Sequence, residues 1–165
     1  MVMMATNIAM YKLINVLGTV ADKTGKEVVV KCSNFVGGGP LPLLSFYYRS
    51  MADTIDNGHA WTNIEIHDKC KAVYVEIDDK IVGACVVDWD PAYLSLFVVL
   101  TAIDKEYRGR GLYKIIFDFL EQKAKEMGAV EITSLVSMSN TTSLEARKSV
   151  GMMPVAYKMR KPLKY

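Results

Sequence analysis

Apolar and polar residues follow one another along the chain in runs that predict short strands separated by helices. Two apolar runs, Ala72–Ile77 and Lys80–Val87, are joined by a pair of aspartates, which is typical of a β-hairpin. The next run, Tyr93–Ile103, is rich in β-branched and aromatic residues and apolar on both faces, so it predicts a central strand covered on both sides. Apolar residues then take helical spacing over residues 112–127, ahead of a glycine that can end a helix.

The first third of the chain carries weaker signals. Residues 1–24 are hard to assign and form an N-terminal extension, in which Ile8–Val20 could be either a helix or a strand. Glu27–Phe35 predicts a strand, and the Gly-Gly-Gly-Pro sequence that follows breaks it. Helical periodicity over Leu43–Ile55 stops at an Asn-Gly pair.

The last third predicts three further elements. Val130–Val136 predicts a strand, and a capping-box pattern that starts at Thr142 predicts a short helix ended by Gly151. Pro154–Pro162 predicts a last strand with a basic end. Since no internal repeat or linker interrupts this order, we expect a single layered α/β (α+β) domain over residues 1–165, built on a mixed sheet.

Composition narrows the class of protein. Of the 165 residues, 51% are hydrophobic and 23% are charged, as in an ordinary soluble globular domain. The net charge of +2 gives no reason to expect nucleic acid or a membrane surface as a partner. Three scattered cysteines, Cys32, Cys70 and Cys85, favour a reducing compartment over a disulfide framework. No signal peptide is evident, so we expect a cytoplasmic protein.

The sequence Arg108-Gly109-Arg110-Gly111 stands where the apolar strand meets the long helix. At such a junction, unpaired backbone N–H groups and the positive end of the helix dipole face the same point and favour an anion. Glycine allows close approach, because a Cβ would hold a phosphate away from the amides. Taken alone, the motif could be a surface turn with two solvated arginines. Its position between strand and helix favours a phosphate-binding turn.

These residues resemble the GNAT acetyltransferase superfamily. At this junction the family has Arg or Gln, two residues, Gly, one residue, and then Gly or Ala. Arg108 and Gly111 match this pattern, whereas Tyr113 stands in place of the last small residue. We expect the Tyr113 side chain to turn away, because only the backbone need approach the phosphate.

A second block extends the resemblance to about residues 72–160. The family has an Asn, a short helix and a Gly-aromatic pair, which Asn140 and Gly151 match, with Met152 where Phe is usual. The resemblance implies a GNAT-like mixed, mostly antiparallel sheet with a splayed parallel strand pair and helices on both faces. It also implies acetyl transfer from acetyl-CoA to an amine by direct attack in a ternary complex.

The same resemblance implies a binding site for acetyl-CoA as co-substrate. The turn would bind the pyrophosphate, and the end of the apolar strand would pair with the pantetheine arm. The residues assigned to CoA in this way are Leu100, Ala102, Ile103, Arg108, Gly109, Arg110, Gly111, Leu112, Tyr113 and Asn140. Asn140 could instead cap a helix, and Arg110 and Lys114 could be solvated charges rather than outer phosphate contacts.

The sequence does not identify the catalytic acid. Many relatives carry a Tyr on the short helix after the Asn, and the matching position here is Arg147. Arginine keeps its proton at neutral pH, so Arg147 could stabilise a thiolate electrostatically but cannot serve as an ordinary acid. Ser149 and Tyr157 are candidate substitutes.

The base is equally open. Three aspartates flank the apolar strand: Asp88, Asp90 and Asp104. An aspartate at such a position is more often a turn or cap residue than a catalytic base. A chain of water molecules could remove the proton instead. The alternative to an enzyme is therefore a catalytically weak or inactive module that binds CoA or a protein partner.

Two further groups of residues have side chains that could carry chemistry. His67 and Cys70 are three residues apart, but no other ligand stands at zinc spacing, so no metal site is expected. A set of aromatic residues could either line an acceptor pocket or pack in the core: Phe46, Tyr47, Tyr48, Trp61 and Trp89. The acceptor could be a small-molecule amine or a protein amine, and a homodimer stays open.

Overall fold

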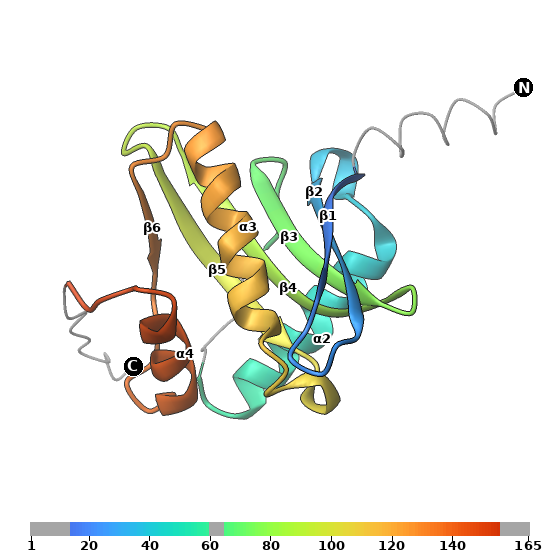
Figure 1. Cartoon of the computed structure of the whole chain (residues 1–165). Coiled ribbons are helices and arrows are strands. Elements are labelled where there is room, and N and C mark those ends of the chain that lie inside the picture. Colours follow the sequence, from blue (N-terminus) through green and yellow to red (C-terminus); the bar gives the residue numbers. More distant parts are fainter. Residues whose placement is uncertain (1–13, 60–64, 156–165) are drawn as a thin grey trace, which may run out of the picture.

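The computed structural model describes residues 14–59 and 65–155, and within them six strands form one sheet (Figure 1). The strand order across the sheet follows the order along the chain. The strands are β1 (Ile14–Ala21), β2 (Glu27–Asn34), β3 (Cys70–Ile77), β4 (Lys80–Asp90), β5 (Ser95–Ile103) and β6 (Glu131–Ser134). Neighbours from β1 to β5 are antiparallel, and β6 runs parallel to β5.

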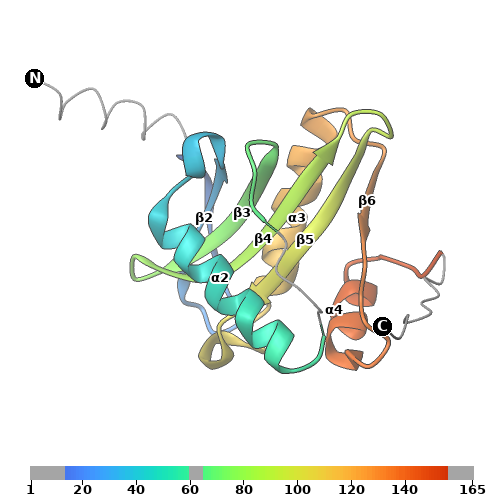
Figure 2. The same cartoon turned by 180° about the vertical axis from the view of Figure 1, so that it is seen from behind.

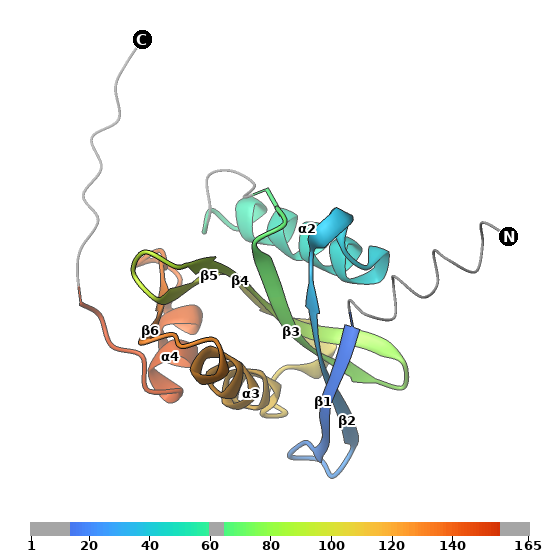
Figure 3. The same ribbon diagram turned by 90° about the horizontal axis from the view of Figure 1, so that it is seen from above.

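The helices lie on both faces of this sheet (Figures 2 and 3). Helix α2 covers one face, whereas α3 and α4 lie on the other. The helices are η1 (Val36–Gly38), α2 (Leu41–Asp56), η2 (Lys105–Tyr107), α3 (Leu112–Glu126) and α4 (Thr141–Ser149). The sequence predicted this arrangement of a mixed sheet between helices, and it is confirmed.

A separate apolar core lies under each of the two long helices. The core under α3 contains Val75, Val98 and Phe117, and the core under α2 contains Tyr47, Tyr74 and Val86. Both faces of the middle strands are therefore buried, which explains why their sequences lack regular alternation of apolar and polar residues. The core thus fixes β3, β4 and β5 as the rigid base on which the site is built.

Most predicted elements form close to their predicted bounds, and Ile14–Ala21 is a strand, which decides between helix and strand for that part of Ile8–Val20. The strand predicted over Tyr93–Ile103 begins two residues later, at Ser95, and it is an interior strand with β4 on one side and β6 on the other. The predicted last strand, Pro154–Pro162, lies mostly outside the described residues, and the two that are described are not in a strand.

The capping box predicted at Thr142 is also wrong. The cap of α4 is Asn140, whose Oδ1 accepts a hydrogen bond from the backbone N–H of Ser143 at 3.0 Å. An Asn at this position satisfies one of the unpaired N–H groups of the first turn, so the helix begins two residues earlier than predicted.

Candidate functional site

The N-terminus of α3 presents a row of unpaired backbone N–H groups. Gly109 and Gly111 take left-handed conformations, with φ of 76° and 84°. Within the described residues, the N–H groups of residues 109–114 donate to no carbonyl or side chain. The first turn carries no side-chain cap and no acidic residue. Because these donors and the helix dipole coincide, the junction is suited to bind an anion.

The turn between β1 and β2 holds this junction in place. Arg110 Nε donates to Asp22 Oδ2 at 2.6 Å, and the Arg110 carbonyl accepts from the Lys23 N–H at 3.1 Å. The aliphatic part of the Lys23 side chain lies against Gly111, where an added Cβ would come within 3.2 Å of Cγ. Arg110 therefore has an ion-pair partner on the β1–β2 turn, whereas the sequence had suggested a solvated charge or an outer phosphate contact.

Asp22 is the buried acceptor of this arrangement. Burial by itself raises its pKa, but hydrogen bonds from Thr24, Arg110 and the Lys26 N–H outweigh burial and lower the pKa to about 2. The carboxylate therefore stays charged at neutral pH and keeps its bond to the arginine. Sequence reasoning missed Asp22 and Lys23, because only the folded sheet brings residues 88 positions apart into contact.

The other two basic residues of the region are also engaged. Arg108 Nε donates to the carbonyl of Ile103 at 3.1 Å, which fixes the path from β5 into the turn. Lys114 pairs with Asp118 one helical turn along α3, at 2.7 Å, and both side chains are exposed. The unpaired donors at this junction are thus backbone amides, whereas both of these basic side chains have partners.

The edge of β5 becomes unpaired next to this turn. Parallel pairing with β6 ends at Val98 and Ser134. On the other side, Val86 pairs with Leu100 and Val87 with Val98, so Val99 is the extra residue of a β-bulge. Beyond this point residues 99–103 pair with β4 on one side and with none of the described strands on the other. The outer backbone groups of Leu100, Ala102 and their neighbours can therefore accept an added extended chain.

Tyr113 and Arg147 stand beside this opening. The Tyr113 ring turns into the core and stacks on Phe117, with ring centroids 4.8 Å apart, as expected for a side chain that leaves the turn accessible. Its hydroxyl is buried and has no hydrogen-bond partner among the described residues. Burial raises the pKa of Tyr113 to about 12, and the charge of Arg147 partly opposes this effect.

Arg147, on α4, is held by Ser134 at the end of β6 and by Ser143 one turn earlier on its own helix. Its Nε donates to Ser134 Oγ at 2.9 Å, and its Nη1 contacts Ser143 Oγ on α4. The charge of Arg147 also acts on the fully buried Cys85 thiol, whose sulfur accepts a hydrogen bond from Thr101 Oγ1 at 3.3 Å. Burial raises the pKa of Cys85 to about 11, although the hydrogen bond from Thr101 and the charge of Arg147 both lower it. Arg147 thus places a fixed positive charge where β5 and β6 separate.

The candidate acids and bases from the sequence have different hydrogen-bond partners in the structure. Ser149 Oγ donates to the carbonyl of Ala146 at 2.7 Å, as a helix-end hydroxyl does, and Tyr157 lies outside the described residues. Asp90 accepts from the Ala92 N–H and is a turn residue. Asp104 pairs with Arg49 at 3.0 Å, as well as with a lysine.

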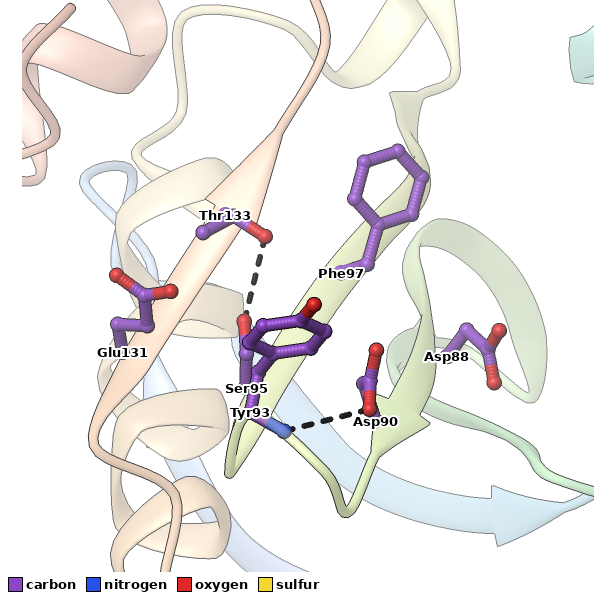
Figure 4. A pocket seen from close by; sticks show the side chains of 7 residues that line it. All are labelled: Asp88, Asp90, Tyr93, Ser95, Phe97, Glu131 and Thr133. Atoms are coloured by element: carbon purple, nitrogen blue, oxygen red, sulfur yellow. Dashed lines mark hydrogen bonds between the residues drawn. The ribbon is translucent and has the colours of Figure 1, made fainter. Parts of the chain in front are cut away.

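Asp88 differs from the other two carboxylates that flank β5. Its Oδ2 lies 3.4 Å from His67 Nε2, and its Oδ1 is buried without a hydrogen-bond partner among the described residues. This carboxylate lies at the wall of a cavity that has a volume of about 340 Å³ (Figure 4). The cavity is lined by Asp88, Asp90, Tyr93, Ser95, Phe97, Glu131 and Thr133.

This cavity opens on the face of the sheet opposite to α3. Along β5, Leu96 and Val98 pack toward α3, so the residues that alternate with them point to the other face. The Ser95 and Thr133 hydroxyls, 3.4 Å apart, form its floor between β5 and β6 (Figure 4). The start of α3, which is suited to an anion, and the acidic cavity therefore lie on opposite faces, with the strand opening between them.

The predicted aromatic set does not line this cavity. Phe46 and Tyr47 lie on the buried face of α2, and Tyr48 is exposed on the same helix. Trp89 packs toward α3, and Trp61 lies outside the described residues. The aromatic residues that do line it, Tyr93 and Phe97, were predicted from the sequence to be parts of a buried strand.

Within the described residues, no helix has the length and apolar character needed to cross a membrane.

Comparison with known proteins places this geometry in a family. The sequence model of the acetyltransferase (GNAT) family matches residues 41–152. An aminoglycoside acetyltransferase, meta-AAC0020 from an uncultured soil metagenomic sample, superposes with a TM-score of 0.61 at 14% identity, over 84% of this chain and 95% of that one. No curated protein matched the sequence.

Two other solved structures share the fold. Aminoglycoside N-acetyltransferase AAC(6')-Iy in complex with CoA has a TM-score of 0.61 at 15% identity, over 82% of this chain and 99% of that one. The ribosomal-protein-alanine N-acetyltransferase from Brucella melitensis biovar Abortus 2308 has a TM-score of 0.60 at 14% identity, over 81% and 99%. At these identities the likeness concerns the fold.

Proposed function

Because the chain belongs to the acetyltransferase (GNAT) family, we propose that it transfers an acetyl group from acetyl-CoA to an amine by direct attack in a ternary complex. The observation that carries this proposal is the junction of β5 and α3. There, unpaired N–H groups of residues 109–114 lie beside an unpaired strand edge over residues 99–103. One end suits a pyrophosphate and the other an extended amide-bearing arm.

The residues at the opening would bind the pantetheine part of CoA. The arm carries amide groups, which can pair with the outer backbone groups of β5 in the manner of an added strand. The buried Tyr113 hydroxyl lacks a partner among the described residues, and an amide carbonyl of the arm would supply one. Asn140 uses its Oδ1 as a helix cap, so its Nδ2 is the group left to donate to the ligand.

The bulge at Val99 would act on the thioester. A bulge leaves one residue out of the regular ladder, so its N–H can point toward a ligand rather than toward β4. Such a donor stabilises the negative charge that develops on the carbonyl oxygen during attack. Binding of the distant pyrophosphate would hold the thioester in place for this step.

Arg147 would stabilise the leaving group. When the amine attacks, the bond between carbonyl carbon and sulfur breaks and the thiolate of CoA leaves with the electron pair. The fixed charge of Arg147, held by Ser134 where the strands separate, favours that thiolate without giving up a proton. Solvent would then protonate the thiolate.

The acceptor amine would approach through the acidic cavity. That cavity lies on the opposite face from the anion site, so both substrates can bind at once. The carboxylates of Asp90 and Glu131 favour a positively charged amine at its mouth, and Tyr93 and Phe97 offer apolar contact. Because the cavity is open to solvent, water can take the proton that the ammonium group must lose before attack.

A screen for release of free CoA from acetyl-CoA would test this function. The acceptors would include aminoglycosides, polyamines, a peptide with a free N-terminal amine and a neutral amide as blank. We expect release to accelerate with at least one amine that carries several positive charges. If calorimetry finds no binding of acetyl-CoA at millimolar concentration, the proposal fails.

The second candidate function is a module that binds CoA without turnover. It is favoured by Arg147 in place of a tyrosine and by the engagement of Asp90 and Asp104 in other contacts. Tight binding of acetyl-CoA without release by any amine would select this candidate. Rapid acetylation of one amine would exclude it.

A further inference from the structure

The fold brings together three metal-ligating side chains beside the cavity described above, and one of them, Asp88, also lines that cavity. His67 precedes β3, Cys70 is its first residue, and Asp88 lies on β4 directly across from Cys70. One ligand atom from each of the three lies within 4.8 Å of the others. The sequence offered His67 and Cys70 without a third ligand at zinc spacing, and the strand register supplies it.

We propose that His67, Cys70 and Asp88 form a zinc site with an open fourth position. An imidazole nitrogen, a thiolate and a carboxylate are a ligand set that suits Zn²⁺ and not Mg²⁺ or Ca²⁺, which take oxygen ligands. Three protein ligands plus a water molecule complete a tetrahedral site. The present separations need only a small inward movement, since His67 Nε2 and Asp88 Oδ2 are already 3.4 Å apart.

The three side chains differ in exposure, so the site is open to solvent on one side and closed on the other. Cys70 is 1% exposed, whereas the His67 and Asp88 side chains are 48% and 37% exposed. An ion can therefore enter from solvent between the histidine and the aspartate and meet the thiol at the inner end. Asp88 Oδ1, buried without a partner among the described residues, is an acceptor that this ion would satisfy.

Charge and protons balance at this site. Zn²⁺ binds as Cys70 loses its thiol proton to solvent, and the thiolate and the Asp88 carboxylate together neutralise the ion. The Lys69 N–H now donates to His67 Nδ1 at 3.3 Å, so the imidazole proton lies on Nε2. Metal binding by Nε2 moves that proton to Nδ1 and breaks this long, exposed hydrogen bond. The backbone N–H can turn to water at small cost.

Zinc binding would link two parts of the chain. It would tie the segment that enters β3 to the end of β4, at the wall of the cavity that Asp88 lines. This role does not depend on the proposed transfer reaction. An enzyme and a binding module would have it equally.

Cobalt absorption on the full-length, metal-free protein tests the proposal. Co²⁺ in a tetrahedral site with a thiolate gives visible bands and a sulfur-to-cobalt charge-transfer band. We expect both bands at about one Co²⁺ per chain, and we expect Zn²⁺ but not Mg²⁺ to abolish them. Absence of the charge-transfer band in the wild type would overturn the proposal.

Variants assign the band to these residues. Cys70→Ser should abolish the charge-transfer band, and Cys32→Ser, which changes a half-buried thiol elsewhere on the sheet, should retain it. Because Cys70 is buried, the second variant is His67→Asn, at an exposed side chain that can be changed without disturbing the core. It should weaken cobalt binding while the melting temperature without metal stays unchanged. A band that persists in Cys70→Ser, or one lost in Cys32→Ser, would contradict the assignment.

Discussion

Asp22 and Arg110 are 88 positions apart in the sequence, yet their ion pair joins the β1–β2 turn to the turn that begins α3. The Asp22 side chain is fully buried, so its charge is supported by hydrogen bonds rather than by water. Because the two side chains pair with each other, we expect neither to contact the proposed ligand. At the scale of residues, the anion site therefore depends on a pair whose role is to position the backbone.

Asp22→Asn tests this pair through its pH dependence. The pKa of Asp22 is lowered from 3.8 to about 2 in the folded protein, so its contribution to stability is complete above about pH 4 and lost as the pH falls toward 2. We expect the melting temperature of the wild type to fall more steeply over this range than that of the variant. Asp118→Asn, in an exposed ion pair on α3, is the control and should follow the wild type. Parallel curves for Asp22→Asn and wild type would contradict the account.

Arg147→Gln tests the proposed stabilisation of the thiolate. Glutamine keeps a donor for Ser134 but removes the charge. With an amine found in the screen, we expect kcat to fall by about 10²-fold, as when a donor to a developing anion is removed, with little change in the affinity for acetyl-CoA. Lys148→Gln, the exposed neighbour on α4, should retain kcat. An unchanged kcat in Arg147→Gln would assign the arginine to structure alone.

At the scale of elements, the sequence predicted what is local. The β3–β4 hairpin and helix α3 follow from apolar spacing and turn residues that act within a few positions. The Arg-Gly-Arg-Gly turn was found for the same reason, because strand, glycine and helix are consecutive. The role of Arg110 was not predicted, since it depends on contact with the distant β1–β2 turn. The cap of α4 was misplaced because two polar residues near the start of the helix compete for this position.

Gly109→Ala tests the turn as an element. Gly109 has φ of 76° and open space where a Cβ would be added, whereas a Cβ at Gly111 would also meet Lys23. Gly128, at the opposite end of α3, has φ of 77° and equally open space, so Gly128→Ala is the matched control. Both variants should lose about 1–2 kcal/mol of stability from left-handed strain.

The two variants should differ in their affinity for CoA. We expect calorimetry to show binding weaker by about tenfold or more for Gly109→Ala, since about 1.4 kcal/mol of lost contact is a factor of ten. Gly128→Ala should bind like the wild type. Equal affinities of the two variants would mean that the phosphate does not approach Gly109.

At the scale of the whole molecule, the two substrates would meet across the sheet. The anion site lies on the side of α3, and the acidic cavity on the side of α2, with the separated end of β5 and β6 between them. The sequence could not predict this cavity, because its lining comes from β4, β5, β6 and the turn that holds Tyr93. In addition, a strand that is apolar on both faces does not show which of its residues are left uncovered by a helix.

Glu131→Gln tests the cavity as the acceptor site. Glu131 is exposed at the start of β6 and lines the cavity, so loss of its charge should raise KM for an acceptor with several positive charges. The effect should shrink at high salt, which screens exposed charges. Glu27→Gln, at the start of β2 away from the cavity, is the control. The same KM in both variants would place the acceptor elsewhere.

A titration of the isotope-labelled protein with CoA, followed by the shifts of its backbone amide resonances, tests the central claim most directly. We expect the largest shifts at residues 109–114, whose N–H groups are unpaired, and at residues 99–103 along the open edge of β5. Amides at the far end of α3, near Gly128, should hardly move. Saturable shifts confined to other parts of the sheet, or none at millimolar CoA, would contradict the account.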